Sequence, residues 1–289
     1  MQAILITAYK DFDYLKYLIH SLKDDEIFLF IHIDKRFYDE HFFDEYKNNE
    51  HVNIISTREI IWGSIHHLNA ILDLLKCASS YNIDFVYFHV ITGQDYMYRN
   101  INEFKSFFKD RNDNFMSCTI CDKSTEFRYK KFFRNDVINY KNKFGNYVTK
   151  FFYILQKLFF INRKPKNIII YKGLVYVSIT NDFVSYILDY INCDEGKYFL
   201  NYLKWCFIPE EFFFQTVLMN SKFKDTLNTD NKRYILWEFK NGTQPAILDI
   251  SDIGNVENGG DKYFMRKVNF QYSKELIDYF NSKEGKNEL

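Results

Sequence analysis

Apolar runs of strand length alternate with helix-patterned segments along the first hundred residues. In the helical segments, apolar side chains such as Leu15, Leu18 and Leu22 recur every three or four positions. The predicted strands are residues 3–7, 27–33, 52–56 and 85–91, and the predicted helices are residues 11–22 and 66–77. This alternation predicts an α/β protein with a parallel sheet and crossover helices.

The pattern loosens from about residue 111 and becomes regular again in the second half. There we predict a strand over residues 174–179, a helix that begins near Asn181 and a motif-dense stretch over 208–268. No repeat and no linker rich in Pro, Gly or Ser divides the chain. We therefore predict one domain, with a nucleotide-sugar-binding half (1–110), an acceptor and catalytic half (111–280) and a frayed polar tail (281–289).

Polar residues follow two of the predicted strands at the edge where such sheets bind ligands. Parallel sheets of this kind hold ligands beyond the carboxyl ends of their strands. The segments His32-Ile33-Asp34-Lys35 and Thr92-Gly93-Gln94-Asp95 both stand there. His32, Asp34 and Asp95 are therefore candidate site residues.

The charge balance excludes some partners. Lys plus Arg (38) equals Asp plus Glu (38), so the formal net charge is zero and the field that would attract nucleic acid is missing. No apolar run approaches the roughly 18 residues of a membrane span, and the first residues lack the basic region and apolar core of a signal peptide. We expect a cytoplasmic protein, or one bound peripherally to the cytoplasmic face of the inner membrane.

Five cysteines, an odd number without repeated pairs, indicate a reducing compartment. Cys118 and Cys121 form a CxxC pair, but no second ligand pair stands at the spacing of a zinc site. We interpret them as structural thiols.

Two adjacent acids, Glu210 and Glu211, follow Pro209 at a predicted helix start. Acids at this place would also serve simply to complement the helix dipole. The aromatic residues 212–214 that follow favour a chemical role, because apolar surroundings raise a carboxylate's pKa and make it a better proton acceptor. Glu211 is thus a candidate general base.

Arg266 and Lys267 are two consecutive basic residues that would neutralise a diphosphate leaving group, although such pairs are also common in solvated turns. Trp237 offers a flat apolar face for a sugar ring, or a side chain for the core. The only D-x-D tripeptide, Asp11-Phe12-Asp13, lies at a helix start, where Asp is favoured as a cap. At the strand end Asp34 is followed by a cation, which predicts a site without a metal.

Taken in order, these segments resemble the core-2/I-branching β-1,6-N-acetylglucosaminyltransferase and peptide O-xylosyltransferase family, in particular its short bacterial members. The resemblance covers most of the chain from residue 1 to about 270. The matching stretches are Ile31-His32-Ile33-Asp34-Lys35, Trp62-Gly63-Ser64, Ile91-Thr92-Gly93-Gln94-Asp95-Tyr96, residues 173–180, Ile208-Pro209-Glu210-Glu211 followed by Phe214-Gln215-Thr216, residues 233–237 and Phe264-Met265-Arg266-Lys267.

The resemblance implies a GT-A-type nucleotide-binding fold, with a mixed, mostly parallel central sheet flanked by helices. It further implies an inverting transfer of a sugar from a UDP-sugar to a hydroxyl of a glycan acceptor, with no metal and no other cofactor. For a short bacterial member we expect a role in surface polysaccharide synthesis, with an acceptor that is carried on a lipid.

The same resemblance assigns roles to residues. The second acid of the family's P-[DE]-E motif, the catalytic base, falls on Glu211, and the lysine of its F-x-x-K segment, which binds the donor diphosphate, falls on Lys267. Animal members have a second diphosphate-binding arginine near the place where this chain has Thr243 and Gln244, so Arg266 or Arg233 would supply that charge. We expect His32 and Asp34 on the nucleotide side, and the acceptor side is assigned to Trp237, Phe239, Asp95 and Arg128.

Two other functions stay open. A hydrolase would need two carboxylates about 5 to 9.5 Å apart across the scissile bond, which adjacent Glu210 and Glu211 would not easily straddle. A catalytically silent carbohydrate-binding or assembly protein could keep the same fold. The motifs are compatible with UDP-GlcNAc, UDP-xylose, UDP-galactose and other donors.

Residues 150–166 form the most apolar window of the chain and carry Lys and Arg at both ends. The window is too short to span a bilayer, but it resembles an interfacial helix that inserts Phe and Leu into anionic lipid. An ordinary helix packed on the sheet would give a similar pattern. A lipid-linked acceptor favours the membrane contact.

Overall fold

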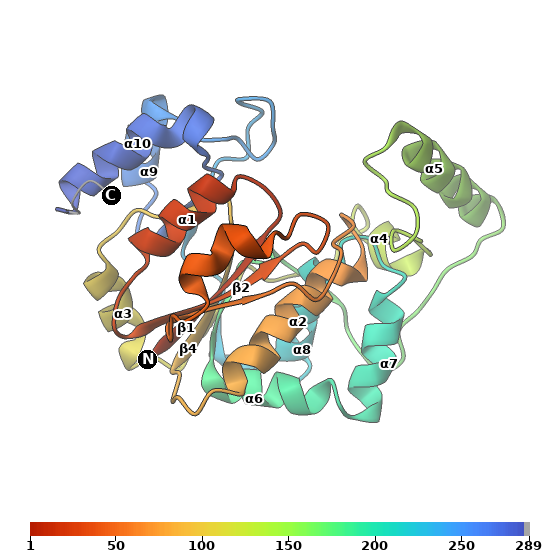
Figure 1. Cartoon of the computed structure of the whole chain (residues 1–289). Helices are drawn as coiled ribbons and strands as arrows, with labels where there is room; N and C mark the ends of the chain where they lie inside the picture. The colour runs from red at the N-terminus through yellow and green to blue at the C-terminus, as the bar shows by residue number, and fades with distance from the viewer. Residues whose placement is uncertain (286–289) are drawn as a thin grey trace.

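A computed structural model describes residues 1–285 and shows one large central sheet flanked by helices (Figure 1). Over these residues the sheet has seven strands in the order β10-β6-β9-β4-β1-β2-β3. All neighbours pair in parallel except β9, which runs antiparallel to both β4 and β6. The predicted α/β class with a mixed, mostly parallel sheet is therefore confirmed. The strands are β1 (Gln2–Ala8), β2 (Ile27–Ile33), β3 (Val52–Ile55), β4 (Tyr87–Thr92), β6 (Asn114–Phe115), β9 (Ser178–Thr180) and β10 (Leu227–Asn228).

Two smaller sheets complete the strand pairing of the described residues. One has the order β11-β12-β5, and the other joins β7 to β8. In the first sheet, Arg266 of β12 stands directly opposite Asp95 of β5. This register brings together two of the candidate site residues. The strands are β5 (Asp95–Met97), β7 (Thr119–Ile120), β8 (Tyr171–Lys172), β11 (Arg233–Ile235) and β12 (Phe264–Arg266).

Both faces of the central sheet are buried. Along β1, Ala3 and Leu5 face one hydrophobic cluster while Ile4 and Ile6 face the other, because successive side chains of a strand point to opposite faces. The near-continuous apolar runs of β1 and β2 are the pattern expected of parallel strands that are covered on both sides.

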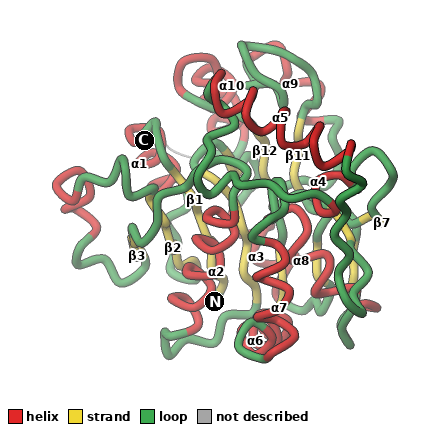
Figure 2. The backbone as a smooth tube through the Cα atoms, turned by 90° about the vertical axis from the view of Figure 1, so that its right-hand side faces the viewer, coloured by secondary structure: helices red, strands yellow, loops and turns green. Residues whose placement is uncertain are grey.

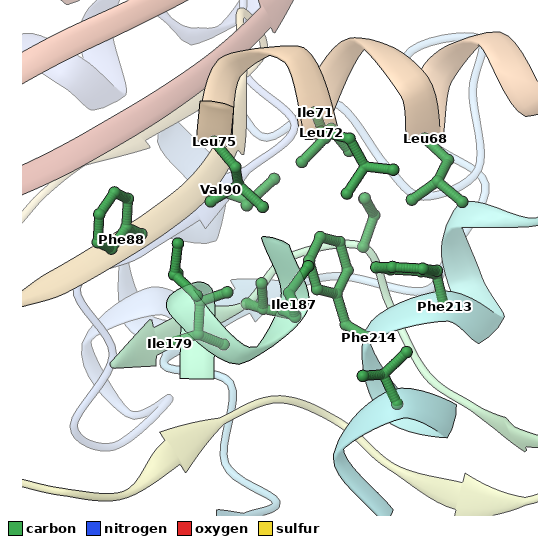
Figure 3. Packing of buried hydrophobic residues seen from close by; sticks show 14 of the residues in the cluster. Leu68, Ile71, Leu72, Leu75, Phe88, Val90, Ile179, Ile187, Phe213 and Phe214 are labelled. Carbon is green, nitrogen blue, oxygen red and sulfur yellow. The ribbon is translucent and has the colours of Figure 1, made fainter. Parts of the chain in front are cut away.

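On one face, α2 (Ile65–Ser79), α6 (Asn181–Tyr190) and α8 (Glu210–Met219) pack over the strands. Figure 3 shows Leu75 of α2 beside Val90 of β4, and Leu68 at the other end of the helix facing Phe213 of α8. On the other face lie α1 (Phe12–Ser21), α3 (Ile101–Lys109) and α10 (Phe270–Lys283). The remaining helices of the described part are α4 (Phe127–Lys130), α5 (Lys143–Leu158), α7 (Asp194–Leu203), α9 (Ile253–Glu257) and the 3₁₀ turns Glu40–Tyr46, Lys224–Thr226 and Ile250–Asp252.

Three local expectations differ from the structure. The strand expected over 174–179 is only Ser178–Thr180, because the backbone before it bonds elsewhere: Gly173 N–H donates to the Glu211 carbonyl and Leu174 N–H to Ser117 Oγ. Gly173 approaches the chain so closely that an added Cβ would lie 1.8 Å from the Ser117 carbonyl oxygen. Only glycine fits this position, which anchors the segment to the first turn of α8.

The prediction of a frayed tail from residue 281 onward is wrong for its first three residues. Residues 281–283 form the end of α10, where Asn281 is buried and its amide donates to Tyr17 Oη at 2.6 Å. Residues 286–289 lie outside the described residues. The expected cap at Asp11 also differs: Asp11 is the N-cap residue of α1, but its side chain makes no capping hydrogen bond and instead lies 3.7 Å from Lys10 Nζ.

Candidate active site

A cavity of about 570 Å³ lies beyond the carboxyl ends of the parallel strands, at the edge where the sequence predicted ligand binding. Ala8 at the end of β1, Asp34 after β2 and Gly93 after β4 all line it. Gly93 keeps these strand ends close together, since a Cβ there would lie 3.1 Å from that of Ala8. The central sheet thus forms the floor of the cavity.

The two adjacent acids stand in the first turn of α8, with Pro209 as its N-cap residue. Both Glu210 and Glu211 line the cavity. The positive end of the helix dipole favours carboxylates here. The two side chains nevertheless differ in exposure, since Glu211 is 28% exposed and Glu210 only 6%.

Glu211 is held by Arg128. Its Oε2 accepts a hydrogen bond from Arg128 Nη2 at 2.8 Å, and the same guanidinium donates to the carbonyls of Phe207 and Ile208 just before α8. Burial raises the pKa of Glu211, while the neighbouring Arg128 acts in the opposite direction. The result is an oriented, partly accessible carboxylate of raised basicity, which suits a general base.

Glu210 has a separate partner that the sequence interpretation missed. Its Oε1 lies 3.0 Å from His67 Nδ1, and His67 Nε2 lies 3.0 Å from Thr7 Oγ1. Its Oε2 is buried without a hydrogen-bond partner among the residues that the structure describes. His67 lines the cavity from the first turn of α2, and the His66-His67 pair at that helix start is the signal that would have pointed to it.

Five cations line the same cavity: Lys10, Arg36, Lys141, Arg266 and Lys267, of which Arg36 is paired with Asp34. Burial, together with the nearby positive charges of Arg266, Lys141 and Lys10, lowers the pKa of Lys267 to about 8. Burial and Lys10 also lower the pKa of Lys141. A site in which neighbouring cations lower the pKa of two lysines gains from a bound anion.

Arg266 and Asp95 form a buried ion pair at the cavity wall. Arg266 Nη1 lies 3.2 Å from Asp95 Oδ2, and both side chains are at least nine-tenths buried. Asp95 also accepts from Thr92 Oγ1 at 2.7 Å, and the guanidinium lies over the Tyr176 ring. Asp95 was expected to bind the acceptor, but it does not line the cavity, and its carboxylate is bonded to Thr92 and Arg266.

On the predicted nucleotide side, Asp34 lines the cavity and His32 does not. Asp34 Oδ2 accepts from Arg36 Nη2 at 2.6 Å and from Ile60 N–H at 3.2 Å. Burial alone would raise the pKa of Asp34, but Arg36 and the backbone donors lower it below its usual value. His32 is fully buried, and its Nε2 lies 3.2 Å from Thr57 Oγ1, so it supports the floor of the site from below.

The other predicted residues fall into two groups. Trp237 lines the cavity with more than half of its surface exposed, as an acceptor-binding ring would. Phe239 is exposed outside the cavity. Arg128 does not line the cavity itself but bonds to Glu211 and Ile208, which do. Arg233 is buried between the sheets, where it donates to Ser178 Oγ at 3.0 Å and to the Asn231 carbonyl. This position is at odds with the diphosphate contact expected of Arg233, since the side chain has no access to the cavity.

Residues 1–285 contain no group of three or more His, Cys, Asp or Glu side chains that is placed to hold a metal ion. Cys118 and Cys121 are free thiols, and burial raises the pKa of both to about 11. None of the helices in this part of the chain has the length and apolar character needed to cross a bilayer.

A comparison with known protein families gives a match over most of the chain. A family model described as "Branch: Core-2/I-Branching enzyme" matches residues 3–257. No curated protein matches the sequence.

Three solved structures are distant neighbours. Mouse xyloside xylosyltransferase 1 in its apo form is 9% identical, with 91% of this chain and 96% of that chain covered and a TM-score of 0.40. The apo WbbM bifunctional glycosyltransferase is 11% identical, with 98% and 50% covered and a TM-score of 0.38. HddC from Yersinia pseudotuberculosis is 18% identical, with a TM-score of 0.28; the match covers 46% of this chain and 64% of the length of HddC.

Proposed function

The chain belongs to the core-2/I-branching enzyme family and is a glycosyltransferase, and from this premise we propose that it transfers a sugar from a UDP-sugar to a hydroxyl of a glycan acceptor, with inversion and without a metal ion. The proposal includes a lipid-linked acceptor of bacterial surface polysaccharide synthesis, reached from the cytoplasm. The observation that carries it is the placement of one oriented carboxylate, Glu211, and five cations around a single cavity at the carboxyl edge of the sheet.

In this mechanism Glu211 accepts the proton of the acceptor hydroxyl. The acceptor oxygen then forms a bond to the anomeric carbon while the bond from that carbon to the diphosphate oxygen breaks on the opposite side. A single displacement with one base and no covalent intermediate inverts the anomeric centre, so an α-linked donor gives a β-linkage. Arg128 keeps the carboxylate aimed at the cavity through its 2.8 Å hydrogen bond.

The cations would stabilise the departing diphosphate. Fixed positive charges that stand where negative charge develops lower the barrier without reorganisation during the reaction. Arg266 is already paired with Asp95, whereas Lys267 and Lys141 line the cavity with lowered pKa values, and Lys10 lines it beside them, 3.7 Å from Asp11. Lys141 and Lys10 therefore replace Arg233 as the candidates for the second diphosphate-binding charge.

A transfer assay tests the function directly. The purified protein is incubated with a panel of UDP-sugars and glycan acceptors, with and without a chelator, and the product anomer is determined by NMR. We expect a β-linked product from an α-linked donor at a rate that the chelator leaves unchanged. Strict dependence on manganese or magnesium would refute the metal-free mechanism, and donor binding without turnover on any acceptor would favour the catalytically silent alternative.

The lowered pKa of Lys267 predicts that donor binding weakens at alkaline pH. The ammonium is charged below about pH 8 and neutral above it, and only the charged form attracts the diphosphate. The donor dissociation constant, measured by calorimetry, should therefore rise above about pH 8 and approach a tenfold increase per pH unit. In Lys267→Arg, whose guanidinium stays protonated, the increase should disappear; an unchanged increase would assign the titration to Lys141.

Trp237→Ala is expected to raise the acceptor KM about tenfold while the donor dissociation constant stays within a few fold, because the ring would stack on the acceptor sugar only. Phe239→Ala is the matched control, since this aromatic is exposed outside the cavity and should leave both constants unchanged. Equal losses for donor and acceptor in Trp237→Ala, or an unfolded variant, would favour a packing role for the ring.

A further inference from the structure

Helix α5 presents its apolar face to solvent. It projects from the body of the fold in Figure 1 and lies in front of it in Figure 2. Its buried positions are small or polar, namely Gly145, Thr149 and Gln156. Its outward positions recur every three or four residues and are 58–80% exposed: Phe144, Tyr147, Phe151, Ile154 and Leu158. This is the reverse of an ordinary surface helix, whose apolar stripe faces the core.

Specific contacts fix this orientation. Gln156 Oε1 accepts from Phe132 N–H at 2.7 Å, and Gln156 Nε2 donates to the Phe132 carbonyl at 2.9 Å. Tyr153 packs edge-on against Phe127, with the ring centroids 5.7 Å apart. Gly145 lets the helix start lie against Asn139, where a Cβ would come within 2.0 Å of the carbonyl oxygen. The fold therefore holds the apolar stripe outward.

The apolar stripe continues beyond the helix. Phe159, Phe160 and Ile161 follow its last residue and are also exposed. Contiguous exposed apolar surface of this extent on a soluble protein marks an interaction site.

The surrounding charge identifies the partner. Residues 137–181 contain eight Lys or Arg residues and no Asp or Glu, in a chain whose net charge is zero. Lys143, Lys150 and Lys157 stand seven residues apart, so they lie along one side of α5 beside the apolar stripe. A second copy of this chain would bring the same positive segment and no acid within it to pair with. An anionic lipid surface complements both the charge and the apolar stripe.

We infer that α5 and residues 159–166 dock the protein on an anionic bilayer, with the apolar stripe in the acyl-chain boundary and the lysines at the headgroups. Asn139 and Lys141, which precede α5, line the cavity. The docked surface thus continues into the wall of the site, where a lipid-linked acceptor would be presented. That last step rests on the proposed function, whereas the docking itself does not.

Vesicle flotation of the full chain without nucleotide sugar tests the docking. We expect binding to phosphatidylcholine vesicles that contain phosphatidylglycerol and none to phosphatidylcholine alone. Binding should be lost between about 0.1 M and about 1 M salt, as the screening length falls from about 10 Å to about 3 Å. Absence of binding of the wild-type protein at low salt would overturn the inference.

Two sets of variants separate the apolar and charged contributions. Replacing three outward apolar residues by Gln should weaken vesicle binding at least on the order of 100-fold, because their burial in lipid is lost. Removing three lysines should weaken it on the order of 100-fold, at roughly fivefold per basic residue. The apolar variant is Phe151→Gln/Ile154→Gln/Leu158→Gln, and the charge variant is Lys143→Gln/Lys150→Gln/Lys157→Gln.

Matched controls remove the same chemistry elsewhere. Each control changes three exposed residues on other elements and should bind vesicles as the wild type does, and all variants should keep the circular dichroism spectrum. The controls are Ile120→Gln/Ile250→Gln/Tyr272→Gln and Lys197→Gln/Lys224→Gln/Lys274→Gln.

The remaining outcomes distinguish the alternatives. A wild-type dimer in sedimentation that the apolar variant abolishes, without vesicle binding, would show that a second copy covers α5 and would overturn the inference. Glu211→Gln should bind vesicles like the wild type, so failure of the chemistry and failure of the docking are seen separately.

Discussion

Replacing Glu211 by Gln is expected to abolish sugar transfer while donor affinity stays nearly unchanged. Loss of a general base typically costs on the order of 10²- to 10⁴-fold in rate, and loss of the only base belongs at the upper end of that range. Gln keeps the shape of the side chain and a hydrogen-bonding oxygen for Arg128, so the turn before α8 should be preserved. The measurements are kcat for transfer and the donor dissociation constant.

Glu210→Gln is the control that the chain itself provides. It changes the neighbouring acid of the same helix turn, but this side chain is almost fully buried and bonded to His67. We expect a far smaller loss of kcat. The opposite result, with Glu211→Gln within a few fold of wild type and Glu210→Gln inactive, would make Glu210 the base and the His67–Thr7 contact its support.

Most of the central sheet could be predicted from the sequence because its strands are buried on both faces and its helices are strongly periodic. The predicted strand over 27–33 is β2 with the same bounds, and the helix predicted over 66–77 is α2 within two residues. The short strands could not be predicted in this way. Pairs such as β7 with β8 contain two residues each and depend on distant partners, which no local pattern records.

The candidate site likewise contains residues that the sequence could predict and residues that only the fold reveals. The positions of Glu211, Lys267 and Trp237 followed from local motifs, and all three line the cavity. Lys141 could not be found from a local pattern, because it lies in a segment without regular periodicity and reaches the cavity only through the tertiary fold. For the apolar window over 150–166 the sequence left two interpretations open, because an apolar helix gives the same pattern whether its apolar side packs inward or faces outward; the structure shows that side exposed.

Asp95 is a motif residue whose role in the structure differs from the role expected from the sequence, because of one tertiary contact. At the sequence level it ends the segment Thr92-Gly93-Gln94-Asp95 and was expected to bind the acceptor. In the fold it is the buried partner of Arg266, across the β5–β12 register. Its role is therefore to position a cation of the cavity wall, and the two roles predict different results on substitution.

Asp95→Asn is expected to destabilise the protein by about 3–5 kcal/mol, because it leaves the Arg266 guanidinium buried without a counter-charge. This is a large part of the total stability of a typical domain, about 5–15 kcal/mol. Urea unfolding should show a lower midpoint with an unchanged slope. The double variant Asp95→Asn/Arg266→Gln should lose less than the sum of the two single changes, since the unpaired charge is then gone.

The kinetics of the same variants separate positioning from acceptor binding. If Asp95 positions Arg266, folded Asp95→Asn protein should bind the donor more weakly, because a cation beside the diphosphate has lost its anchor, and its acceptor KM should change little. Wild-type stability together with a selective rise in acceptor KM would restore the acceptor role expected from the motif. The buried pair predicts the first result, because Asp95 is sealed from the cavity that the acceptor would enter.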